Sequence, residues 1–575
     1  MLIWKKLYKI FKSLLLRGEP IMQYTADFET TTDPHDCRVW AYGVCEIGNP
    51  ENFIYGNNIA DFMQWCKNNP ATYYFHNLKF DGEFILCWLF ENGFKHVEDK
   101  RDLNTNTFCS LISDKGQFYS LEICFERKGR NLNKTIIYDS LKILPFGVDQ
   151  IAKGFNLPIS KLEIDYNEYR EVGHVLTPKE VDYLRNDVDI VARALHTIFE
   201  QGLTKMTQGS NALFDYKRIV TAKNFNKWFP IPDYDSDIRQ SYKGGFTYCS
   251  SRFQGKDIGE GIVLDVNSLY PSVMYYSPLP YGEGKFFKGK YKEDKIYNLY
   301  VQMITCQFEV KENHIPTIQL KNNLAFIPTQ YLESSDGEDV TLCLTSVDLE
   351  LFLNHYEVYN IEYHCGWKFK STIGLFKEYI DKWNSVKMES TLNGNHAMRT
   401  LAKLMLNSLY GKFALNPNVQ SKIPIYDNRV IKYKLGAKET REPIYIPVGT
   451  FITAWARHKT ITSAQKVYAR FIYADTDSLH LVGTELPEGL EIDPVQLGAW
   501  KHESTFSRAR FLRQKSYIEE IDGKLHITCA GMPERCYKHV TWDNFHAGMS
   551  YEGKLQMSHV GGGIVLKDID FTIKK

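Results

Sequence analysis

The chain has 575 residues, 43% of them hydrophobic and 14% aromatic, which gives room for several domain cores and excludes a disordered or fibrous protein. Lys plus Arg and Asp plus Glu balance at 69 each, so the net charge does not mark a nucleic-acid-binding protein, and any basic surface must be local. The 12 cysteines form no C-x-x-C pair, which argues against zinc and a disulfide framework and favours a reduced compartment, and no run of about 18 apolar residues predicts a membrane-spanning helix.

Residues 1–21 predict a basic amphipathic helix, because apolar and basic side chains recur on opposite faces at helical spacing. The apolar stretch is too broken and too basic for a secretory signal. Three interpretations stay open: the helix could lie on an anionic membrane, pack on the rest of the protein, or be a dispensable extension. Met22 could then be the first residue of the compact fold.

Three carboxylates follow two predicted strands near the N-terminus. Strand alternation places Asp27 and Glu29 on the same face. A second apolar run, residues 73–76, leads into a turn that contains Asp81. Taken singly, the first two would simply end a strand, and Asp81 would cap a helix.

A predicted helix over residues 179–200 adds Tyr183 and Asp187, which stand at i and i+4 and therefore share one face. On its own, Asp187 would be an exposed helical residue. Together with the three preceding carboxylates it can form a two-metal site, because hard cations such as Mg²⁺ take oxygen ligands and a pair of them supports phosphoryl transfer.

Two glycines stand in the segment Tyr242-Lys243-Gly244-Gly245-Phe246. Glycine lets a backbone come close to another group. That group could be a phosphate chain, and a plain turn fits the composition equally well.

Two further apolar runs end in carboxylates. Residues 261–266 predict a buried strand that carries Asp265 to its end, and residues 471–481 predict a β-hairpin with Asp475 and Asp477 at its tip. Little Lys or Arg stands beside this pair in the sequence to neutralise it. An Asp-x-Asp pair alone is most often a solvated turn, but with Asp265 it can complete a second two-metal site.

Two basic stretches could contact phosphates. On a predicted helix that begins near Asn395, the side chains Arg399, Lys403 and Asn407 recur every four residues and share one face. This face suits a triphosphate, although a solvated basic stripe is the simpler interpretation. Residues 502–517 interleave cations with aromatic side chains, which suits a track along a phosphate backbone.

These motifs, in this order, resemble those of the family B DNA polymerases, and of their protein-primed branch of the phi-29 type in particular. Residues 265–271 match DxxSLYP, residues 473–478 match YxDTDS, and residues 403–411 match Kx3NSxYG. The first four carboxylates, with Asn77 and Tyr183, match the Exo I, Exo II and Exo III motifs of 3′–5′ exonucleases. The resemblance covers residues 22–575.

The resemblance implies a DNA-directed DNA polymerase with a 3′–5′ proofreading exonuclease and two Mg²⁺ ions at each site, for which Mn²⁺ could substitute. In the synthesis site it implies that Asp265, the Val266 carbonyl and Asp477 bind the metals and that Asp475 assists. In the exonuclease site, Tyr183 would orient the attacking water and Lys161 would offset charge on the scissile phosphate. The implied metal ligands there are Asp27, Glu29, Asp81 and Asp187, with Glu163 near them.

The resemblance also implies contacts with substrates. Tyr270 would pack against the sugar of the incoming nucleotide and leave no room for a 2′-OH. The implied nucleotide-binding residues are Tyr270, Lys387, Arg399, Lys403, Asn407 and Tyr410. The implied DNA-binding residues are Thr30, Tyr74, His76, Asn77, Phe80, Phe84, Ser140, Leu141, Tyr242, Gly244, Gly245, Thr453, Arg457, Lys515 and Tyr517. The chain departs from the usual motifs at Arg399, where a lysine is usual, and at Ala456, where the Tx2GR motif has glycine.

The expected fold is α/β, a mixed multidomain protein with an RNase H-like exonuclease and a right-hand polymerase of palm, fingers and thumb. Two insertions would serve protein priming and strand displacement. The expected domains are a basic extension (1–21), the exonuclease (22–207), the first part of the palm (208–276), insertion 1 (277–374), the fingers (375–414), insertion 2 (415–447), the second part of the palm (448–530) and the thumb (531–575).

The implied partners are template–primer DNA, dNTPs and a terminal protein that serves as primer. The protein would be a monomer that forms a heterodimer with the terminal protein at initiation. It would replicate a linear phage-type genome processively in the host cytoplasm, and residues 1–21 could attach it to a membrane surface. Two rivals remain: a nuclease with a degenerate C-terminal scaffold, and a non-catalytic module that binds the terminal protein or single-stranded DNA.

Overall fold

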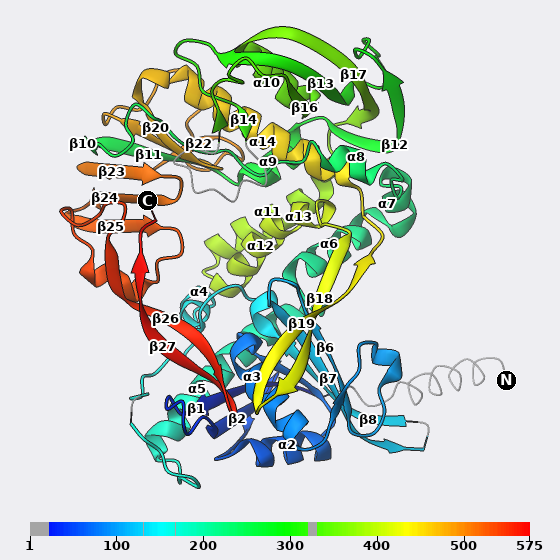
Figure 1. Ribbon diagram of the computed structural model, residues 1–575, viewed down its shortest axis with the longest axis vertical. Coiled ribbons are helices and arrows are strands. Elements are labelled where there is room, and N and C mark those ends of the chain that lie inside the picture. Colours follow the sequence, from blue (N-terminus) through cyan, green and yellow to red (C-terminus); the bar gives the residue numbers. More distant parts are fainter. Residues whose placement is uncertain (1–21, 130, 167, 320–330, 575) are drawn as a thin grey trace, which may run out of the picture.

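The computed structural model describes residues 22–129, 131–166, 168–319 and 331–574. The helix predicted over residues 1–21 lies outside these ranges. Figure 1 shows a lower body built from the N-terminal third of the chain and an upper body built from the rest. Within the described ranges, no helix is long and apolar enough to cross a membrane.

The lower body is built on a mixed eight-stranded sheet in the order β3-β2-β1-β4-β8-β7-β6-β5. Strand β1 pairs antiparallel with β2 and parallel with β4. The strands are β1 Gln23–Thr30, β2 Val39–Glu46, β3 Asn49–Gly56, β4 Thr72–Phe75, β5 Lys95–His96, β6 Thr107–Ile112, β7 Phe118–Lys128 and β8 Asn131–Asp139.

Alternation along β1 decides which helix each side chain meets. Ala26 and Phe28 belong to a buried cluster shared with helices α2 (Ile59–Asn68) and α3 (Leu78–Glu91). On the other face, the Thr25 hydroxyl donates to the Val188 carbonyl of α5 (Pro178–Glu200), 2.8 Å away. Asp27 and Glu29 share the face of Thr25 and therefore point toward α5.

Helix α5 confirms the helix predicted over residues 179–200. It begins in a capping box, in which the Thr177 hydroxyl accepts from the Glu180 N–H at 3.3 Å and the Glu180 carboxylate accepts from the Thr177 N–H at 2.9 Å. Pro178 occupies the first turn, where its missing N–H has no cost. The chain continues through α4 Val148–Gly154 before α5, and then α6 Gln208–Val220, α7 Ala222–Trp228 and α8 Asp235–Arg239.

The upper body is organised around a five-stranded sheet in the order β22-β11-β21-β20-β9. A second sheet beside it has the order β10-β23-β24-β25. The strands are β9 Thr247–Cys249, β10 Asp257–Ile258, β11 Gly261–Val266, β20 Phe471–Asp475, β21 Ser478–Val482, β22 Trp500–Phe506, β23 Arg508–Arg513, β24 Ser516–Ile521 and β25 Lys524–Cys529. The structure therefore confirms the predicted strand that ends near Asp265 and the predicted hairpin at residues 471–481.

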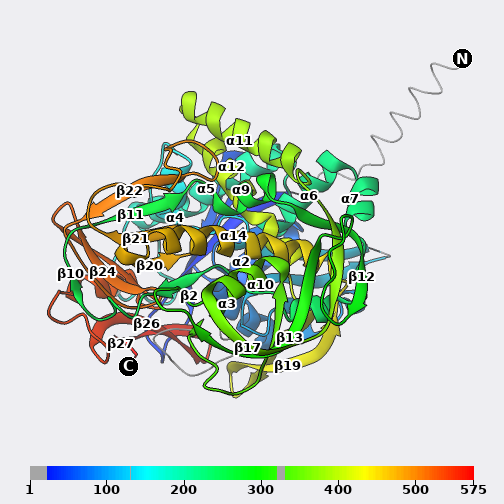
Figure 2. The same ribbon diagram turned by 90° about the horizontal axis from the view of Figure 1, so that it is seen from above.

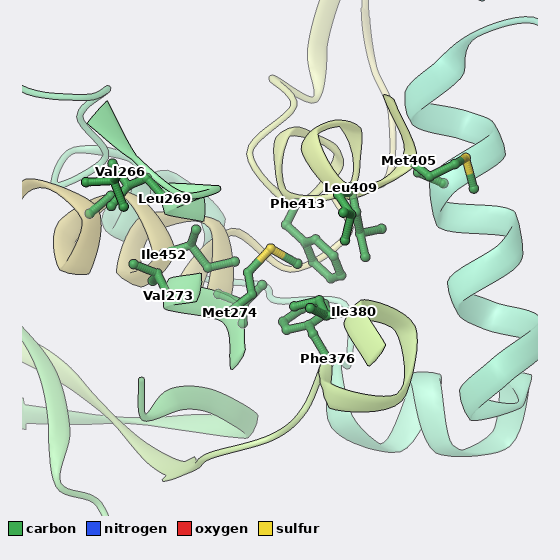
Figure 3. Packing of buried hydrophobic residues seen from close by; sticks show 14 of the residues in the cluster. Val266, Leu269, Val273, Met274, Phe376, Ile380, Met405, Leu409, Phe413 and Ile452 are labelled. Atoms are coloured by element: carbon green, nitrogen blue, oxygen red, sulfur yellow. The ribbon is translucent and has the colours of Figure 1, made fainter. Parts of the chain in front are cut away.

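A shared apolar core joins this sheet to the helices that face it. Figure 3 shows Met274 next to Phe413 and Phe376, with Val266 and Leu269 farther along the same buried cluster. Each side chain of this size contributes roughly 1.5–3 kcal/mol when fully buried, so the two groups of elements form one packed unit. The helices are α9 Leu269–Tyr276, α11 Lys377–Leu392, α12 His396–Ser408, α13 Tyr410–Phe413 and α14 Ile446–Lys466. The Asn395 side chain caps α12 by accepting from the Met398 N–H at 3.1 Å, which confirms the predicted start of that helix.

Residues 277–374 form a separate sheet in the order β12-β17-β13-β16, with α10 against it. Helix α10 also contacts α14, so this sheet is attached to the upper body on one side. The elements are β12 Leu279–Lys288, β13 Leu299–Val310, β14 Ile318–Gln319, β15 Tyr331–Leu332, β16 Val340–Thr345, α10 Ser346–His355 and β17 Tyr356–Thr372.

Two long hairpins run from the upper body to the lower one (Figure 1). They are β18 (Asn418–Asp427) with β19 (Val430–Thr440), and β26 (Ser550–Val560) with β27 (Gly563–Thr572). Both contact helix α3, and β19 also contacts β26. In the view from above (Figure 2), β19 and the β26–β27 pair lie along the same side of the molecule. The hairpins and the two bodies therefore form a closed ring of contacts.

A polar cluster joins the three elements where the ring closes. The Tyr433 hydroxyl of β19 donates to Glu83 Oε1 of α3 at 2.7 Å, and His559 Nδ1 of β26 lies 3.6 Å from Glu83 Oε2. The Glu83 carboxylate raises the pKa of His559 through this contact. This junction was not predicted from the sequence.

Candidate active sites

The first site is a group of buried carboxylates between β1, α3 and α5. Asp81 is 3% exposed, Asp187 5% and Glu29 7%. Burial, together with the charge of Asp187, raises the pKa of Asp27 to about 7. Burial and the charges of Asp27 and Asp187 also raise the pKa of Glu29 well above its ordinary value. The fold therefore gathers negative charge where desolvation makes it most costly.

This arrangement suits a divalent cation. The Oδ1 atoms of Asp81 and Asp187 are buried and have no hydrogen-bond partner among the described residues. Such orphaned anionic oxygens are costly unless a cation or donor satisfies them. Within the described ranges, no three His, Cys, Asp or Glu side chains already converge on a metal position.

Lys161 and Tyr183 border these carboxylates. Lys161 Nζ lies 2.8 Å from Asp187 Oδ2. Burial disfavours the ammonium, but the Asp187 contact outweighs burial and raises the pKa of Lys161. The Tyr183 hydroxyl lies 2.6 Å from the Tyr166 hydroxyl. The sequence prediction missed Tyr166, although it lies only five residues after Lys161.

Glu163 stands apart from this group. Its side chain is exposed, and no recorded contact links it to the buried carboxylates among the described residues. The structure thus brings together four of the five predicted metal ligands of this site.

The predicted contacts with single-stranded DNA divide into two groups. Thr30, His76, Phe80 and Leu141 are partly exposed, and Asn77 is exposed at the start of α3. The remaining three are interior residues: Tyr74 is 3% exposed, Phe84 2% and Ser140 0%.

Core packing covers Tyr74, Phe84 and Ser140 in this structure, so their direct contact with DNA stays a prediction. The Ser140 hydroxyl donates to the Phe75 carbonyl at 3.0 Å and meets His76 Nδ1 at 3.0 Å. The buried Ser140 therefore helps to fix the ring of the partly exposed His76.

The second site is a row of residues across the five-stranded sheet. Strand register pairs Lys501 with Asp265, Asp265 with Ser478, Ser478 with Asp475, and Asp475 with Thr247. Residues directly opposite one another on neighbouring strands project to the same face. Asp265 and Asp475 therefore share a face, and Asp477 lies in the turn between β20 and β21, where its carbonyl accepts from the Val266 N–H at 2.8 Å.

Two lysines from distant parts of the chain pair with this row. Lys515 Nζ lies 2.8 Å from Asp475 Oδ2, and Lys501 Nζ lies 3.6 Å from Asp265 Oδ1. The inference that these carboxylates lack neutralising cations was therefore wrong, since the sequence shows only neighbours along the chain. Burial, followed by the charge of Asp477, still raises the pKa of Asp265 to about 6, and burial raises the pKa of Asp477.

The predicted triphosphate-binding side chains approach one another on α11 and α12. Burial, and then the charges of Lys403, Arg399 and Lys501, lower the pKa of Lys387. Arg399 Nε is buried without a hydrogen-bond partner among the described residues. Mutually repelling cations with an unused donor are suited to a polyanion.

Tyr270 and Tyr410 stack directly on each other. Their ring centroids are 4.0 Å apart and their planes 14° apart. Both rings are half-buried, Tyr270 on α9 and Tyr410 on α13. The two predicted nucleotide-flanking tyrosines thus form one aromatic wall.

The predicted glycine linker packs against the turn between β20 and β21, which contains Thr476. A Cβ at Gly245 would lie 2.5 Å from Thr476 Oγ1, whereas one at Gly244 would meet nothing within 4 Å among the described atoms. The Phe246 carbonyl accepts from the Thr476 N–H at 2.7 Å. The sequence left two interpretations of the glycines open, a close approach to a phosphate chain or a plain turn. In the structure Gly245 instead lies close to Thr476.

Arg457 and Thr453, both predicted to contact DNA, are buried in this structure. Arg457 is 2% exposed and Thr453 1%. The Arg457 guanidinium forms an ion pair with Asp348 of α10 at 2.7 Å and donates to the Lys243 and Gly244 carbonyls, each at 2.7 Å. Arg457 therefore holds the linker in position in this structure. Asp348 was not predicted from the sequence as its partner.

The last predicted DNA contacts lie at the edge of the row. Lys515 is exposed in a left-handed conformation (φ 53°), and its N–H donates to the Tyr473 hydroxyl at 3.0 Å. Tyr517 is half-buried and stacks on Phe511 with centroids 4.8 Å apart. Tyr242 is half-buried, and burial with the nearby Tyr410 raises its pKa.

Comparisons with known proteins agree over nearly the whole chain. Residues 63–493 match the family described as "DNA polymerase type B, organellar and viral". The DNA polymerase of Bacillus phage M2 is 51% identical, over 96% of this chain and 99% of the phage protein. That of Bacillus phage phi29 is 49% identical, over 97% of this chain and 100% of the phage protein.

Solved structures give the same result. Phi29 DNA polymerase complexed with primer-template DNA and incoming nucleotide substrates has a TM-score of 0.91 and 49% identity, over 96% of this chain and 100% of that chain. Phi29 DNA polymerase complexed with single-stranded DNA has the same TM-score and identity.

Proposed function

The chain belongs to the type B DNA polymerases of organelles and viruses, as a close homologue of the phi29 enzyme, and on that premise we propose that this DNA polymerase also carries a 3′–5′ exonuclease and starts synthesis on a protein primer. The observation that carries the exonuclease proposal is the buried group of Asp27, Glu29, Asp81 and Asp187, two of whose oxygens have no partner among the described residues.

In the synthesis site, Asp265 and Asp477, with the Val266 carbonyl, would hold two Mg²⁺ ions, and Asp475 would assist. Bound ions would neutralise charge on the transferring phosphoryl group and activate the attacking oxygen. The cations of α11 and α12 would bind the triphosphate, and the wall of Tyr270 and Tyr410 would exclude a 2′-OH. Lys515 would lie beside the primer end.

In the exonuclease site, the four carboxylates would hold two further ions, for which Mn²⁺ could substitute. Lys161 would be released from Asp187 when an ion takes over that carboxylate, and its ammonium would then be free to offset charge on the scissile phosphate. The hydroxyl of Tyr183, held by Tyr166, would orient the attacking water. His76, Phe80 and Leu141 leave a partly exposed surface on which a frayed 3′ end could stack.

Separation of the two activities tests this assignment. We expect Asp265→Ala or Asp477→Ala to abolish dNTP incorporation and to leave Mg²⁺-dependent shortening of single strands intact. The double variant Asp27→Ala/Glu29→Ala should do the reverse. Glu171→Ala, at an exposed carboxylate of the same region, is the matched control. Loss of both activities in one folded variant would overturn the two-site proposal, and so would binding of DNA without any turnover.

Protein priming and strand displacement are supported by the two segments that interrupt the upper body. Residues 277–374 form their own sheet with a buried cluster of its own, a surface on which a terminal protein could dock. The β18–β19 hairpin closes the ring with α3 and β26, which would enclose DNA during synthesis. At initiation, a hydroxyl side chain of the terminal protein would attack the α-phosphate in place of a 3′-OH, and pyrophosphate would leave.

The priming proposal predicts a covalent protein–nucleotide product. The chain, mixed with a terminal protein, Mg²⁺ and labelled dNTP, should transfer label to that protein as a heterodimer forms. Label only on DNA would contradict it. We also propose that the protein acts in the host cytoplasm and that residues 1–21, which lie outside the described ranges, attach it to anionic membranes. Equal sedimentation with anionic vesicles of the full chain and a chain starting at Met22 would contradict the attachment.

A further inference from the structure

Lys501 lies at the synthesis site although no motif assigns it there. Its strand β22 pairs with β11, and its register partner is Asp265. The two side chains therefore project to the same face of the sheet. The Lys501 ammonium lies 2.6 Å from Glu503 Oε2 and 3.6 Å from Asp265 Oδ1.

Glu503 holds this lysine at the mouth of the site. Strand β22 is irregular at Glu503, where its register with β11 shifts, so the ion pair rather than strand alternation places the two side chains together. The side chain of Lys501 is 31% exposed, Asp265 30% and Glu503 52%. The ammonium is thus open on one side, and its shorter contact is with Glu503 rather than Asp265. Release of Asp265 to another cation would leave it attached to Glu503.

Lys501 also belongs to a wider group of positive charges. Burial lowers the pKa of Lys403, and the charges of Arg399 and Lys501 add to this effect. Burial, and then the charges of Lys403, Arg399 and Lys501, lower the pKa of Lys387. Lys501 on the sheet and the cations of helices α11 and α12 therefore lie close enough to affect one another, and Asp265 lies beside this group. Arg399 Nε, buried without a partner among the described residues, has a free donor in this group.

A chain of negative phosphates would relieve this repulsion. The incoming dNTP carries such a chain, and its α-phosphate must lie at Asp265 to react. We propose that Lys501 binds the β- and γ-phosphate oxygens of the incoming dNTP from the sheet side, with Glu503 as the positioning residue for its ammonium. Lys387, Arg399 and Lys403 grip the same triphosphate from the helix side. This inference rests on the proposed placement of the synthesis site at Asp265.

A second role for Lys501 has to be distinguished from this one. An ammonium beside Asp265 could act only as a competitor of the divalent cation. Its removal would then lower the Mg²⁺ concentration needed for synthesis and would leave dNTP affinity unchanged. The phosphate-binding role requires weaker dNTP binding instead, because a charge-assisted donor is lost.

Equilibrium binding without turnover separates the two roles. The full chain is bound to a primer-template with a dideoxy 3′ end in Ca²⁺, and dNTP is titrated against it. We expect Lys501→Gln to raise the Kd for dNTP about tenfold, the effect of one hydrogen bond to a charged group. The Kd for dNMP, which lacks the β- and γ-phosphates, should not change. Lys501→Arg should retain most of the affinity for dNTP.

The control is Lys524→Gln, at an exposed lysine of β25, which should bind dNTP like the unmodified chain. Equal dNTP affinity of Lys501→Gln and the control would overturn the inference and leave the polymerase assignment intact. An equal loss for dNMP and dNTP would also overturn it, since the contact would not be with the outer phosphates. If the unmodified chain bound no dNTP at all, the proposed synthesis site would fail first.

Discussion

Breaking the buried ion pair between Arg457 and Asp348 should destabilise the upper body strongly. Its side chains are 3% and 10% exposed. Arg457 Nε and Nη2 reach the Asp348 carboxylate at 3.0, 2.8 and 2.7 Å. Asp348→Ala would leave the guanidinium buried and without its counter-charge. Removing one partner of such a pair typically costs about 3–5 kcal/mol.

The same pair predicts a pH dependence. Burial alone would raise the pKa of Asp348, but the Arg457 charge outweighs burial and lowers the pKa. A carboxylate with a depressed pKa in the folded state stabilises the fold above the unfolded-state pKa. This contribution should therefore be complete at neutral pH. It should be lost as the pH falls below about 4, the ordinary value for aspartate, toward the depressed one.

Urea unfolding followed by tryptophan fluorescence measures the effect. Lys432→Met is the matched control, because its pair with Asp427 is 56% and 49% exposed and should be worth about 0.5 kcal/mol or less. The double variant Asp348→Leu/Arg457→Met should recover most of the stability, since apolar replacement of a buried pair is often neutral. A loss in Asp348→Ala no larger than in the control would refute the reasoning, and so would the same loss at pH 3 as at pH 7.

Three further variants test other contacts. Gly245→Ala places a Cβ 2.5 Å from Thr476 Oγ1 and should slow synthesis by about 10- to 100-fold, because it would displace the turn that contains Asp477. Gly244→Ala, where a Cβ meets nothing within 4 Å among the described atoms, is the control in a primer-extension assay. Equal rates for the two variants would contradict the predicted effect. Tyr166→Phe removes the hydroxyl that lies 2.6 Å from the Tyr183 hydroxyl and should reduce the degradation of single strands several-fold without changing dNTP incorporation. An equal loss of dNTP incorporation would contradict a role of Tyr166 in the exonuclease site alone. Tyr433→Phe removes the 2.7 Å hydrogen bond to Glu83 and should shorten the product made per binding event while leaving single-nucleotide incorporation unchanged. A primer-extension assay with a DNA trap measures this product length. Products of unchanged length would mean that this contact does not hold the ring closed.

Local patterns in the sequence predicted the elements that carry the carboxylates. An apolar run ending in Asp265 and a hairpin with Asp475 and Asp477 at its tip are short-range features, and the structure contains both. The helix that carries Tyr183 and Asp187 begins one residue before its predicted start. These elements need only nearby residues to form, so their periodicity and turns were sufficient.

The partners of these residues could not be predicted in the same way. Arg457 matched a DNA-binding motif, yet its counter-ion Asp348 lies 109 residues away, and burial between them removes the arginine from any surface. Lys501 and Lys515 reach the carboxylates through strand pairing and a left-handed turn. Tyr74 and Phe84 have the aromatic character of stacking residues, but the same character suits a core. Such choices depend on contacts between distant segments, which a motif does not record.

The most direct test of the whole account is primer extension on a gapped circular template with Mg²⁺ and dNTPs and with no clamp or helicase added. We predict product much longer than the circle, because the ring of contacts closed by β18–β19, α3 and β26–β27 would keep the DNA bound during synthesis. Extension that stops at the downstream strand would contradict the role of the ring. A primer that is only shortened would contradict synthesis at Asp265 itself.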